Sequence, residues 1–404
     1  MNFHKENKEL QSLLDNSSSE STYLNNLNIH VGNNEHENIV KAMRKFGERV
    51  LFCTGNRAMR HYGFLDIYLK LFSKFNFRVV YYDNISVNPT LKQMEEGLTV
   101  AKEFNPDFIF ALGGGSVIDT AKVISVGLFG DIWDFVEKKQ EIKKAIPIVA
   151  SATTSGTGSH VTPYAVITNT DTLQKKTLKH DLLLPKMSIN DLDIIKYMPK
   201  YIIATTGFDV LCHATEVFTR NECTNIAENF CIKSCKSIRE NLVSSYNQDS
   251  VKNKLGMIYA DIYAGIALAL IGTHVPHAIS HPISARFQNI NHGHSLAYIT
   301  AETAKKLIEK KNSNLNNKFR FLSDILGGSS DFVRAVNNYK QLLGLNSIHT
   351  FNDMDCQLIY EDTLGYRRDS VDRSPVVLLD EDIKDIIFHS LKNDNAKINK
   401  GHHL

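Results

Sequence analysis

The sequence lacks any cysteine pattern that would predict a disulfide framework or a structural zinc site. Its 404 residues include only six cysteines, and no two of them stand in a CxxC spacing. Sparse cysteines in a chain of this length are typical of proteins kept in a reducing compartment. The N-terminal residues are polar and lack the apolar core of a signal peptide. We therefore expect a cytoplasmic protein with free thiols.

The chain also lacks an excess of either charge and a long hydrophobic run. Lys and Arg number 46 against 44 Asp and Glu, so no long-range field favours a nucleic acid or an anionic membrane as partner. The longest apolar run, 264–272, is far shorter than the roughly 20 residues that cross a bilayer. A hydrophobic content of 43% is that of a globular protein. We expect a partner that is a small molecule.

The residue pattern changes near Lys200. Before it, short apolar runs alternate with amphipathic stretches such as 64–74 and 91–104; the runs are 50–54, 77–82, 108–112, 146–150 and 165–168. This alternation predicts a mostly parallel sheet with helices on both faces. After Lys200, segments at helical period follow one another, at 202–220, 224–246, 249–272, 295–311, 316–328, 329–344 and 381–391. We expect four parts: a mobile N-terminal extension (1–27), an α/β domain (28–200), an all-α domain (201–392) and a tail (393–404).

A glycine-rich turn follows the third apolar run. Gly113, Gly114 and Gly115 lead from the predicted strand into a predicted helix, with Ser116 where an N-cap belongs. Asp119, three residues on, loosely fits a capping box. Glycines let the backbone approach a ligand, and the free N–H groups of a helix start favour a pyrophosphate. The alternative is a tight turn that binds no ligand.

A second loop, at 151–159, is rich in small hydroxyl residues, among them Thr153, Thr154 and Thr157. Such a loop can line a ribose or a phosphate, although it could also be a plain connection. Two loops of these kinds at the carboxyl ends of strands favour dinucleotide binding. We therefore expect the α/β domain to be Rossmann-like and to bind a dinucleotide.

Carboxylate and imidazole side chains recur at helical spacing in the all-α domain. Asp209 and His213 are four residues apart, and so are His277 and His281; each pair shares one helical face and could grip a divalent ion. Five of the sixteen histidines fall within 21 residues, the others being His274, His292 and His294. This density favours a metal site, although such pairs also form surface hydrogen bonds. Spacing alone does not say which histidines are ligands.

Taken in order, these segments resemble the iron-containing (group III) alcohol dehydrogenases. The shared motifs are NPT (88–90), GGGSVIDTAK (113–122), TTSGTGS (153–159), GFDVLCHATE (207–216) and HAISHPISAR with HG (277–293). The resemblance spans nearly the whole chain. It implies a dehydroquinate synthase-like architecture, with a dinucleotide-binding α/β domain and an all-α metal-binding domain, and commonly a homodimer.

Carried over residue by residue, the resemblance implies the ligands and contacts of the site. Fe²⁺ or Zn²⁺ would be bound by Asp209, His213, His277 and His292, and His281 matches the histidine near the reacting carbonyl. Lys175, with Lys176 as fallback, matches a nucleotide-contacting lysine. The full set of implied nucleotide contacts is Thr54, Gly55, Asn88, Gly113, Gly114, Gly115, Ser116, Asp119, Thr153, Thr154, Thr157 and Lys175.

The chain departs from the family pattern in three places. The stretch from His277 to His292 is one residue longer than usual, so His294 or His274 could replace His292 as the last ligand. His160 stands where the family usually has Glu, and Ala152 where it usually has Pro. We expect the last two changes to alter the pocket without removing a ligand.

The cofactor is expected to be NAD(H) or NADP(H). Members of the family that prefer NAD often carry an acidic residue after the first strand, where this chain has Gly55. Without that carboxylate, a 2′-phosphate is not repelled, and Arg57 or Arg60 could pair with it. The alternative is that both arginines only coat a helix surface. The pattern favours NADPH.

The implied reaction is reversible hydride transfer between nicotinamide and a primary alcohol or aldehyde, with the metal as Lewis acid and His281 relaying a proton. Two other hypotheses stay open: a metal- and NAD-dependent lyase or cyclase of the dehydroquinate synthase type, and a nucleotide-binding module without chemistry. Within the dehydrogenases, the stretch 277–297 faintly resembles phosphonoacetaldehyde reductases, with Arg286 as a partner for the phosphonate.

Overall fold

The computed structural model describes residues 3–17, 21–248 and 250–401. The chain divides into two compact units: the first runs to Asp171 and resumes over Lys176–Met198, and the second consists of Thr172–Lys175 and the residues from Pro199 onward. The first unit is built on a parallel sheet and the second is helical. The expected fold class is therefore confirmed.

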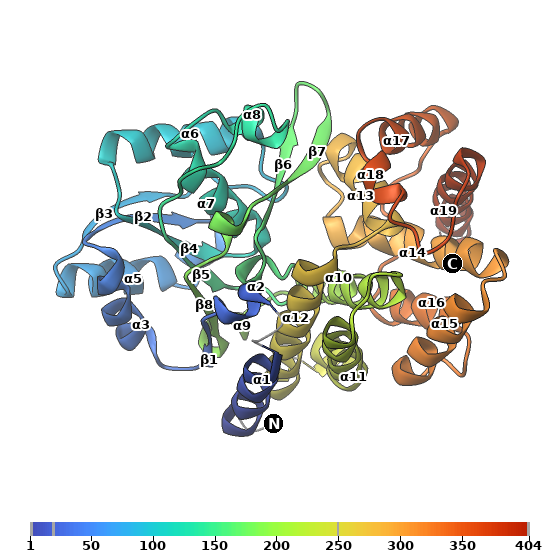
Figure 1. The fold of residues 1–404 in the computed structure, drawn as a ribbon, viewed down its shortest axis with the longest axis horizontal. Helices are drawn as coiled ribbons and strands as arrows, with labels where there is room; N and C mark the ends of the chain where they lie inside the picture. Colours follow the sequence, from blue (N-terminus) through green and yellow to red (C-terminus); the bar gives the residue numbers. More distant parts are fainter. Residues whose placement is uncertain (1–2, 18–20, 249, 402–404) are drawn as a thin grey trace. The chain divides into compact units, whose positions relative to one another are not determined.

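A six-stranded parallel sheet forms the centre of the first unit (Figure 1). Its strands lie in the order β1 (Ile29–Gly32), β8 (Met187–Asp191), β5 (Ile148–Ala152), β4 (Phe108–Gly113), β2 (Arg49–Thr54) and β3 (Arg78–Tyr82). After β2, the chain adds β3 on one side of it and then crosses back to add β4 and β5 on the other side. The order of strands therefore reverses between the neighbouring strands β2 and β4. Ligands of such sheets bind at the carboxyl ends of the strands beside this reversal. Those ends are Thr54 and Gly113.

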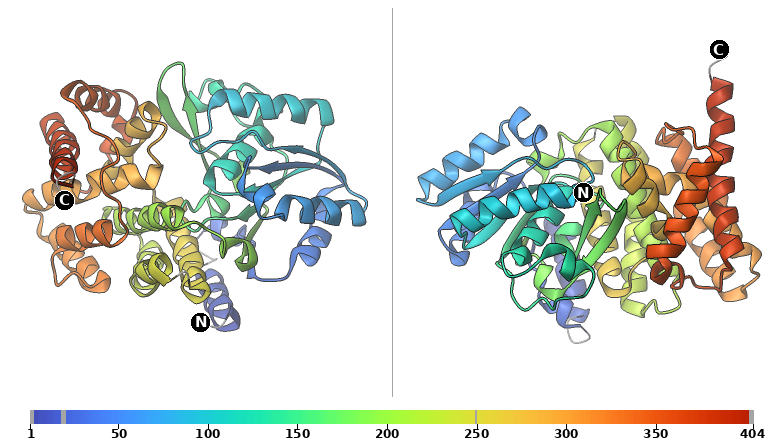
Figure 2. Two further views of the ribbon diagram at one scale, coloured as in Figure 1. Left: turned by 180° about the vertical axis from the view of Figure 1, so that it is seen from behind. Right: turned by 90° about the horizontal axis from the view of Figure 1, so that it is seen from above.

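Helices cover both faces of the sheet (Figures 1 and 2). The helices α6 (Leu91–Phe104) and α7 (Gly115–Gly127) pack on one face, and α3 (His36–Met43) and α5 (Phe64–Lys74) pack on the other. On β2, Leu51 and Cys53 join the first core while Phe52 joins the second. Because both faces of the sheet are covered here, the middle of β2, residues 50–53, is apolar on both sides. The shorter helical segments of this unit are η2 (Arg44–Phe46), α4 (Ala58–His61), α8 (Ile132–Val136), η3 (Ser159–Val161), η4 (Asp181–Leu183) and α9 (Leu192–Ile195).

The apolar run at 165–168 forms a strand but does not join the main sheet. It lies in β6 (Tyr164–Asn169), which pairs with β7 (Gln174–Lys179) in a separate two-stranded sheet. The tip of this pair, Thr172–Lys175, is grouped with the helical unit. Lys175 is therefore positioned among helices, although the residues around it are strand residues.

The N-terminal stretch expected to be a mobile extension is helical where it is described. It contains α1 (Phe3–Ser17) and α2 (Thr22–Asn25), with Leu10, Leu14 and Leu24 buried. The hydroxyl of Tyr23 donates a hydrogen bond to the carbonyl oxygen of Val161 at 2.5 Å. Its mobility stays a prediction. At the other end, α19 (Asp380–Gly401) continues through most of the expected tail, whose last residues, 402–404, lie outside the described residues.

The second unit is a bundle of helices around α10 (Lys200–Thr219), which packs most extensively against three others. Its neighbours are α11 (Asn225–Gln248), α12 (Val251–Ile271) and α14 (His292–Glu309). Among the described residues, α12 alone is long and apolar enough to cross a membrane, but 78% of its apolar window is buried inside the protein, as in a core helix. The remaining helices are α13 (Val275–Arg286), α15 (Ser313–Leu326), α16 (Phe332–Leu342), α17 (Asp353–Tyr366) and α18 (Arg368–Val371), before α19.

A buried lysine ties the loop after β5 to α7. The ammonium group of Lys122 donates to the carbonyl oxygens of Ser159 (2.6 Å), Thr162 (2.9 Å) and Tyr164 (2.6 Å). Burial lowers the pKa of Lys122 to about 8. Because carbonyl oxygens replace the water that the ammonium loses, the cation is tolerated and fixes the backbone of residues 159–164.

His160 lies within this segment and is also buried. Burial and the neighbouring charge of Lys122 lower the pKa of His160 to about 3. The unfolded chain, in contrast, protonates a histidine near its ordinary pKa of about 6.5. Below that pH the unfolded state holds a proton that the folded state does not.

We expect the protein to lose stability as the pH falls from about 6.5 toward about 3, because protonation of His160 then favours the unfolded chain. The contribution of this one residue approaches about 1.4 kcal/mol per pH unit. Urea unfolding at several pH values measures it, and His160→Gln should make the dependence shallower by that amount. An equally steep dependence in the variant would show that other groups cause it.

Candidate metal and nucleotide sites

Three helices of the second unit bring the predicted metal ligands to one point. Asp209 and His213 lie on α10, His277 on α13, and His292 is the first residue of α14. The Oδ1 atom of Asp209 is 3.4 Å from the Nε2 of His213, 3.5 Å from that of His277 and 3.9 Å from that of His292. One carboxylate oxygen thus faces three imidazole nitrogens.

Glycine allows the helices to approach this closely. A Cβ atom on Gly293 would lie 1.8 Å from the backbone carbonyl oxygen of Thr205, on α10. A Cβ on Gly207 would lie 2.1 Å from the side chain of Leu242, on α11. Because a backbone oxygen cannot move aside as a side chain can, Gly293 fixes the distance between the start of α14 and α10. His292 is held at that start.

The donor atoms fit a divalent metal ion. Within the part of the chain that the structure describes, Asp209 Oδ1 and His277 Nε2 are buried and have no hydrogen-bond partner. Unpaired polar atoms in a protein interior cost free energy, so a pair of them aimed at one point calls for a ligand. Asp209, His277 and His292 each offer a ligand atom within 4.8 Å of the others. A carboxylate and imidazoles are donors that suit Fe²⁺ and Zn²⁺.

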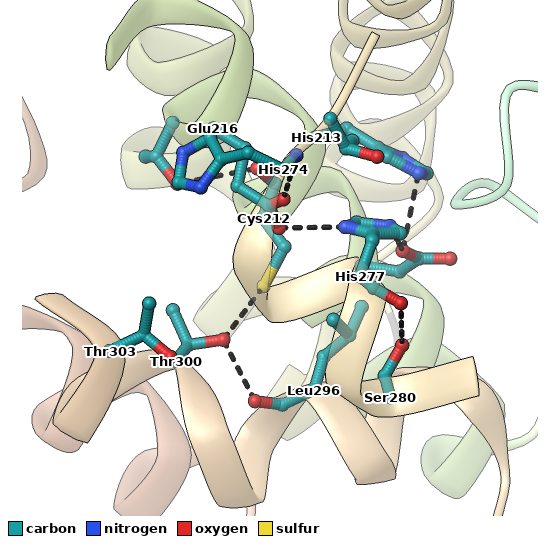
Figure 3. Close-up of polar contacts among 12 residues, drawn as sticks. Cys212, His213, Glu216, His274, His277, Ser280, Leu296, Thr300 and Thr303 are labelled. Carbon is teal, nitrogen blue, oxygen red and sulfur yellow. Dashed lines mark hydrogen bonds and ion pairs between the residues drawn. The ribbon is translucent and has the colours of Figure 1, made fainter. Parts of the chain in front are cut away.

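A second carboxylate, Glu216, orients the cluster. Its Oε1 accepts a hydrogen bond from His277 Nδ1 at 2.7 Å, and its Oε2 accepts one from the backbone N–H of His274 at 2.9 Å (Figure 3). With Nδ1 protonated, His277 turns the lone pair of Nε2 toward Asp209. The sequence prediction gave Glu216 no role, although Asp209, His213 and Glu216 recur at i, i+4 and i+7 on one helical face.

The carboxylates of Asp209 and Glu216 favour positive charge on the groups between them. Burial opposes a charge on His277, but Glu216 and Asp209 more than offset it and raise the pKa of His277 to about 9. For His292 the balance is opposite: although its Nε2 lies 3.9 Å from Asp209 Oδ1, burial and the charge of Lys175 lower the pKa of His292 well below its ordinary value. The protein therefore stabilises a cation at the centre of the cluster and a neutral imidazole at its edge.

The fallback histidines have other partners. His274 Nε2 lies 3.1 Å from the hydroxyl of Thr219, and His294 Nε2 donates to the carbonyl oxygen of Asn346 at 2.7 Å. Of the three histidines left open for the last ligand, the structure brings His292 to Asp209.

His281 lies beside the cluster. Its ring centroid is 5.4 Å from that of His292, and its Nδ1 is 3.2 Å from the backbone carbonyl oxygen of Lys175. A carbonyl oxygen only accepts, so Nδ1 carries the proton and Nε2 keeps a lone pair. The ammonium of Lys175 lies 3.1 Å from the hydroxyl of Ser284, whereas the fallback Lys176 is paired with Glu137 at 2.5 Å.

The glycine turn in the first unit caps α7 differently from the sequence prediction. Gly114, in an extended conformation, is the N-cap, so Ser116 lies inside the first turn of the helix. The expectation of an N-cap at Ser116 is wrong, because the backbone already leaves the strand two residues earlier. Asp119 makes no capping box either: its carboxylate accepts hydrogen bonds from the hydroxyl of Ser159 (2.6 Å) and the N–H of Val166 (3.0 Å).

The two loops predicted to bind a nucleotide lie against each other. The N–H of Thr153 donates to the carbonyl oxygen of Gly113 at 3.0 Å. A Cβ on Gly115 would lie 2.7 Å from Thr157, and one on Gly114 would lie 3.2 Å from Thr154. Any side chain at these glycines would therefore fill the space between the loops.

The other predicted nucleotide contacts lie outside these two loops. Thr54, at the end of β2, donates to the carbonyl oxygen of Leu112 at 2.9 Å, and Gly55 follows it. Asn88 is buried before α6 with a left-handed backbone (φ 54°). Of the two arginines considered for a 2′-phosphate, Arg60 is paired with Asp83 at 2.8 Å. Arg57 is exposed.

Comparison with known proteins identifies the family. Residues 26–192 match the model for iron-containing alcohol dehydrogenase, and residues 203–356 match that for the C-terminal domain of the Fe-containing alcohol dehydrogenase family. The chain belongs to the iron-containing alcohol dehydrogenase family.

Individual relatives agree with this assignment. The chain is 33% identical to the aldehyde-alcohol dehydrogenase of Streptococcus pneumoniae over 62% of its own length, but it spans only 30% of that longer protein. It is 28% identical to NADH-dependent butanol dehydrogenase A of Clostridium acetobutylicum, over 67% of this chain and 72% of that one. Among solved structures, the archaeal Red Sea brine pool alcohol dehydrogenase ADH/D1 superposes with a TM-score of 0.86 and 30% identity, over 90% of this chain and 97% of that one.

We expect Glu216→Gln to weaken binding of Fe²⁺ or Zn²⁺ about 10- to 100-fold, because the neutral amide no longer holds His277 in the tautomer that binds metal. Competition with a chelator, followed by elemental analysis, measures the affinity. Glu302→Gln, which removes a surface partner of Lys305 on α14, should bind metal like the parent. Equal affinity in Glu216→Gln and the parent would contradict the role assigned to Glu216.

Proposed function

We propose that this protein is a metal-dependent, NAD(P)-linked alcohol dehydrogenase or aldehyde reductase. It would transfer hydride between nicotinamide and a primary alcohol or aldehyde. The observation that carries the proposal is the buried carboxylate oxygen of Asp209, which faces three imidazoles and has no hydrogen-bond partner among the described residues. Membership of the iron-containing alcohol dehydrogenase family supports it.

The metal would be held by Asp209, His213, His277 and His292. A divalent iron or zinc ion supplies a Lewis acid that polarises an aldehyde carbonyl or lowers the pKa of an alcohol. Asp209 provides the negative charge that keeps a cation in an apolar bundle. Glu216 holds His277 so that its Nε2 is free to coordinate.

The nucleotide would be held by backbone groups. The free N–H groups at the start of α7 suit a pyrophosphate, and the glycines before it place no side chain beside them. Bound NAD(P)H supplies the hydride. We favour NADPH, because no acidic side chain stands at Gly55 and the exposed Arg57 could pair with a 2′-phosphate.

His281 would handle the proton. Its Nδ1–H is engaged by the carbonyl oxygen of Lys175, so Nε2 is the atom that can accept a proton from an alcohol. Reduction of an aldehyde would return a proton by the same atom. The hydrogen bond to Lys175 keeps the ring in one orientation, as a relay requires.

Reconstitution tests the proposal. Metal-free protein is loaded with Fe²⁺ or Zn²⁺ under anaerobic conditions, and oxidation of NADPH and NADH is followed with a panel of short aldehydes. We expect metal-dependent turnover that falls about 1,000-fold or more in Asp209→Asn and His277→Ala, because the Lewis acid contributes several kcal/mol to the transition state. Glu302→Gln serves as the matched control and should retain activity.

Two outcomes would contradict it. Turnover that persists without metal would remove the Lewis acid from the account. Binding of metal and nucleotide with no oxidation of any aldehyde would favour the lyase hypothesis. The homodimer and the cytoplasmic location remain part of the proposal, and light scattering tests the first.

A further inference from the structure

Two buried cations lie near His281 within the helical unit. Lys175 and Arg367 are only 5% and 9% exposed. The backbone of Lys175 is held on both sides, since its carbonyl oxygen accepts from His281 Nδ1 at 3.2 Å and its N–H donates to the hydroxyl of Tyr366 at 3.4 Å. Arg367 is the next residue after Tyr366, at the end of α17. The chain thus brings both cations to the same part of the unit.

Not every N–H group of the Arg367 guanidinium has a hydrogen-bond acceptor. Its Nη2 donates to the hydroxyl of Ser370 at 2.8 Å, but its Nε is buried and has no hydrogen-bond partner within residues 3–17, 21–248 and 250–401. Arg367 also forms no ion pair with a carboxylate in that part of the chain. The nearest carboxylate, Asp369, is reached only through Ser370, whose hydroxyl lies 3.5 Å from Asp369 Oδ1. The Nε–H of Arg367 still has no acceptor among the described residues, and a buried donor without one is costly, so it indicates a missing acceptor.

The charge of both cations reaches His281. After burial, the charges of Arg367 and Lys175 are the main causes that lower the pKa of His281 well below its ordinary value. Arg286, the cation that the sequence suggested for a phosphonate, is paired with Asp362 at 2.6 Å, so its charge is already balanced. Lys175 and Arg367, together with His277, supply positive charge beside His281.

We propose that Arg367 and Lys175 bind the anionic group of the substrate, which would be a small aldehyde or alcohol carrying a carboxylate, phosphonate or phosphate ester. This inference rests on the proposed function, since it assigns the substrate class of the same site. A guanidinium offers a planar pair of donors that matches such oxyanions, and Nε–H is one of them. The lysine adds a point charge that does not depend on the geometry of the anion.

The phosphates of the nucleotide are the other source of the same chemistry. The family resemblance implies a nucleotide contact for Lys175, so a substrate anion and a cofactor phosphate must be distinguished by experiment. The kinetics of matched substrates separate them, because the two anions belong to different reactants.

The test compares 4-oxobutanoate with its methyl ester, which has the same aldehyde but no charge. In the metal-loaded parent we expect a lower KM for the acid than for the ester. Arg367→Gln should raise the KM for the acid about 10- to 100-fold, while the KM values for the ester and for NADPH change less than about twofold. Arg367→Lys should recover part of the effect. Arg334→Gln, at an exposed position on α16, carries the same loss of charge and should match the parent.

The outcomes are distinguishable. A raised KM for NADPH in Arg367→Gln, with the acid unaffected, would assign the cations to the nucleotide and overturn the inference. Equal KM values for acid and ester in an active parent would overturn it while leaving the proposed dehydrogenase intact.

If no aldehyde is turned over, the proposed function fails and binding decides the inference alone. Methylphosphonate is then the probe, and its effect on the melting temperature is measured. Methylphosphonate should raise the melting temperature of the parent and should not raise that of Arg367→Gln. In Arg367→Lys the increase should be smaller than in the parent. No shift in the parent would overturn the inference, and circular dichroism shows whether each variant is folded.

Discussion

A single buried carboxylate oxygen sets the main constraint on the helical unit. Asp209 Oδ1 lies among apolar helices and faces three imidazole nitrogens. A carboxylate in such a place is stable only with a cation beside it. The packing of α10, α13 and α14 follows from this requirement: Gly293 lets α14 reach the backbone of α10, and Glu216 joins α10 to His277 on α13. The same contacts that hold the helices together also shape the candidate metal site.

The first unit builds its candidate site by a different physical route. Its donors are backbone N–H groups at the start of α7, and its side chains serve to hold loops in place. Lys122 anchors the segment after β5 through carbonyl oxygens, and Asp119 receives the hydroxyl of Ser159. Charge is thus used for structure in one unit and for candidate ligand binding in the other.

The sequence predicted the elements that neighbouring residues define, and it missed those that depend on contacts between residues far apart in the chain. The helices 64–74 and 91–104 were predicted to the residue, because an apolar face defines each of them and a capping box at Thr90 also marks the start of the second. Strands β1, β7 and β8 were missed: β8 reads MSIND, and its polar Ser188 and Asn190 are buried by tertiary packing that no local pattern records. The i,i+4 spacing places Asp209 and His213 on one face of α10 in any helix, but no local pattern records that His277 on α13 and His292 on α14 lie beside Asp209. Arg367, which lies far along the chain from Lys175, had no local signal.

Anomalous X-ray diffraction tests the central claim most directly. Crystals of the iron-loaded protein would be measured on both sides of the iron absorption edge. We predict one anomalous peak about 2.0–2.2 Å from Asp209 Oδ1 and from the Nε2 atoms of His213, His277 and His292. A peak beside His294, or at the other group of potential ligands among the described residues, His36 with Asp191 and Asp193, would contradict it. So would protein that holds one iron per chain with no peak at Asp209.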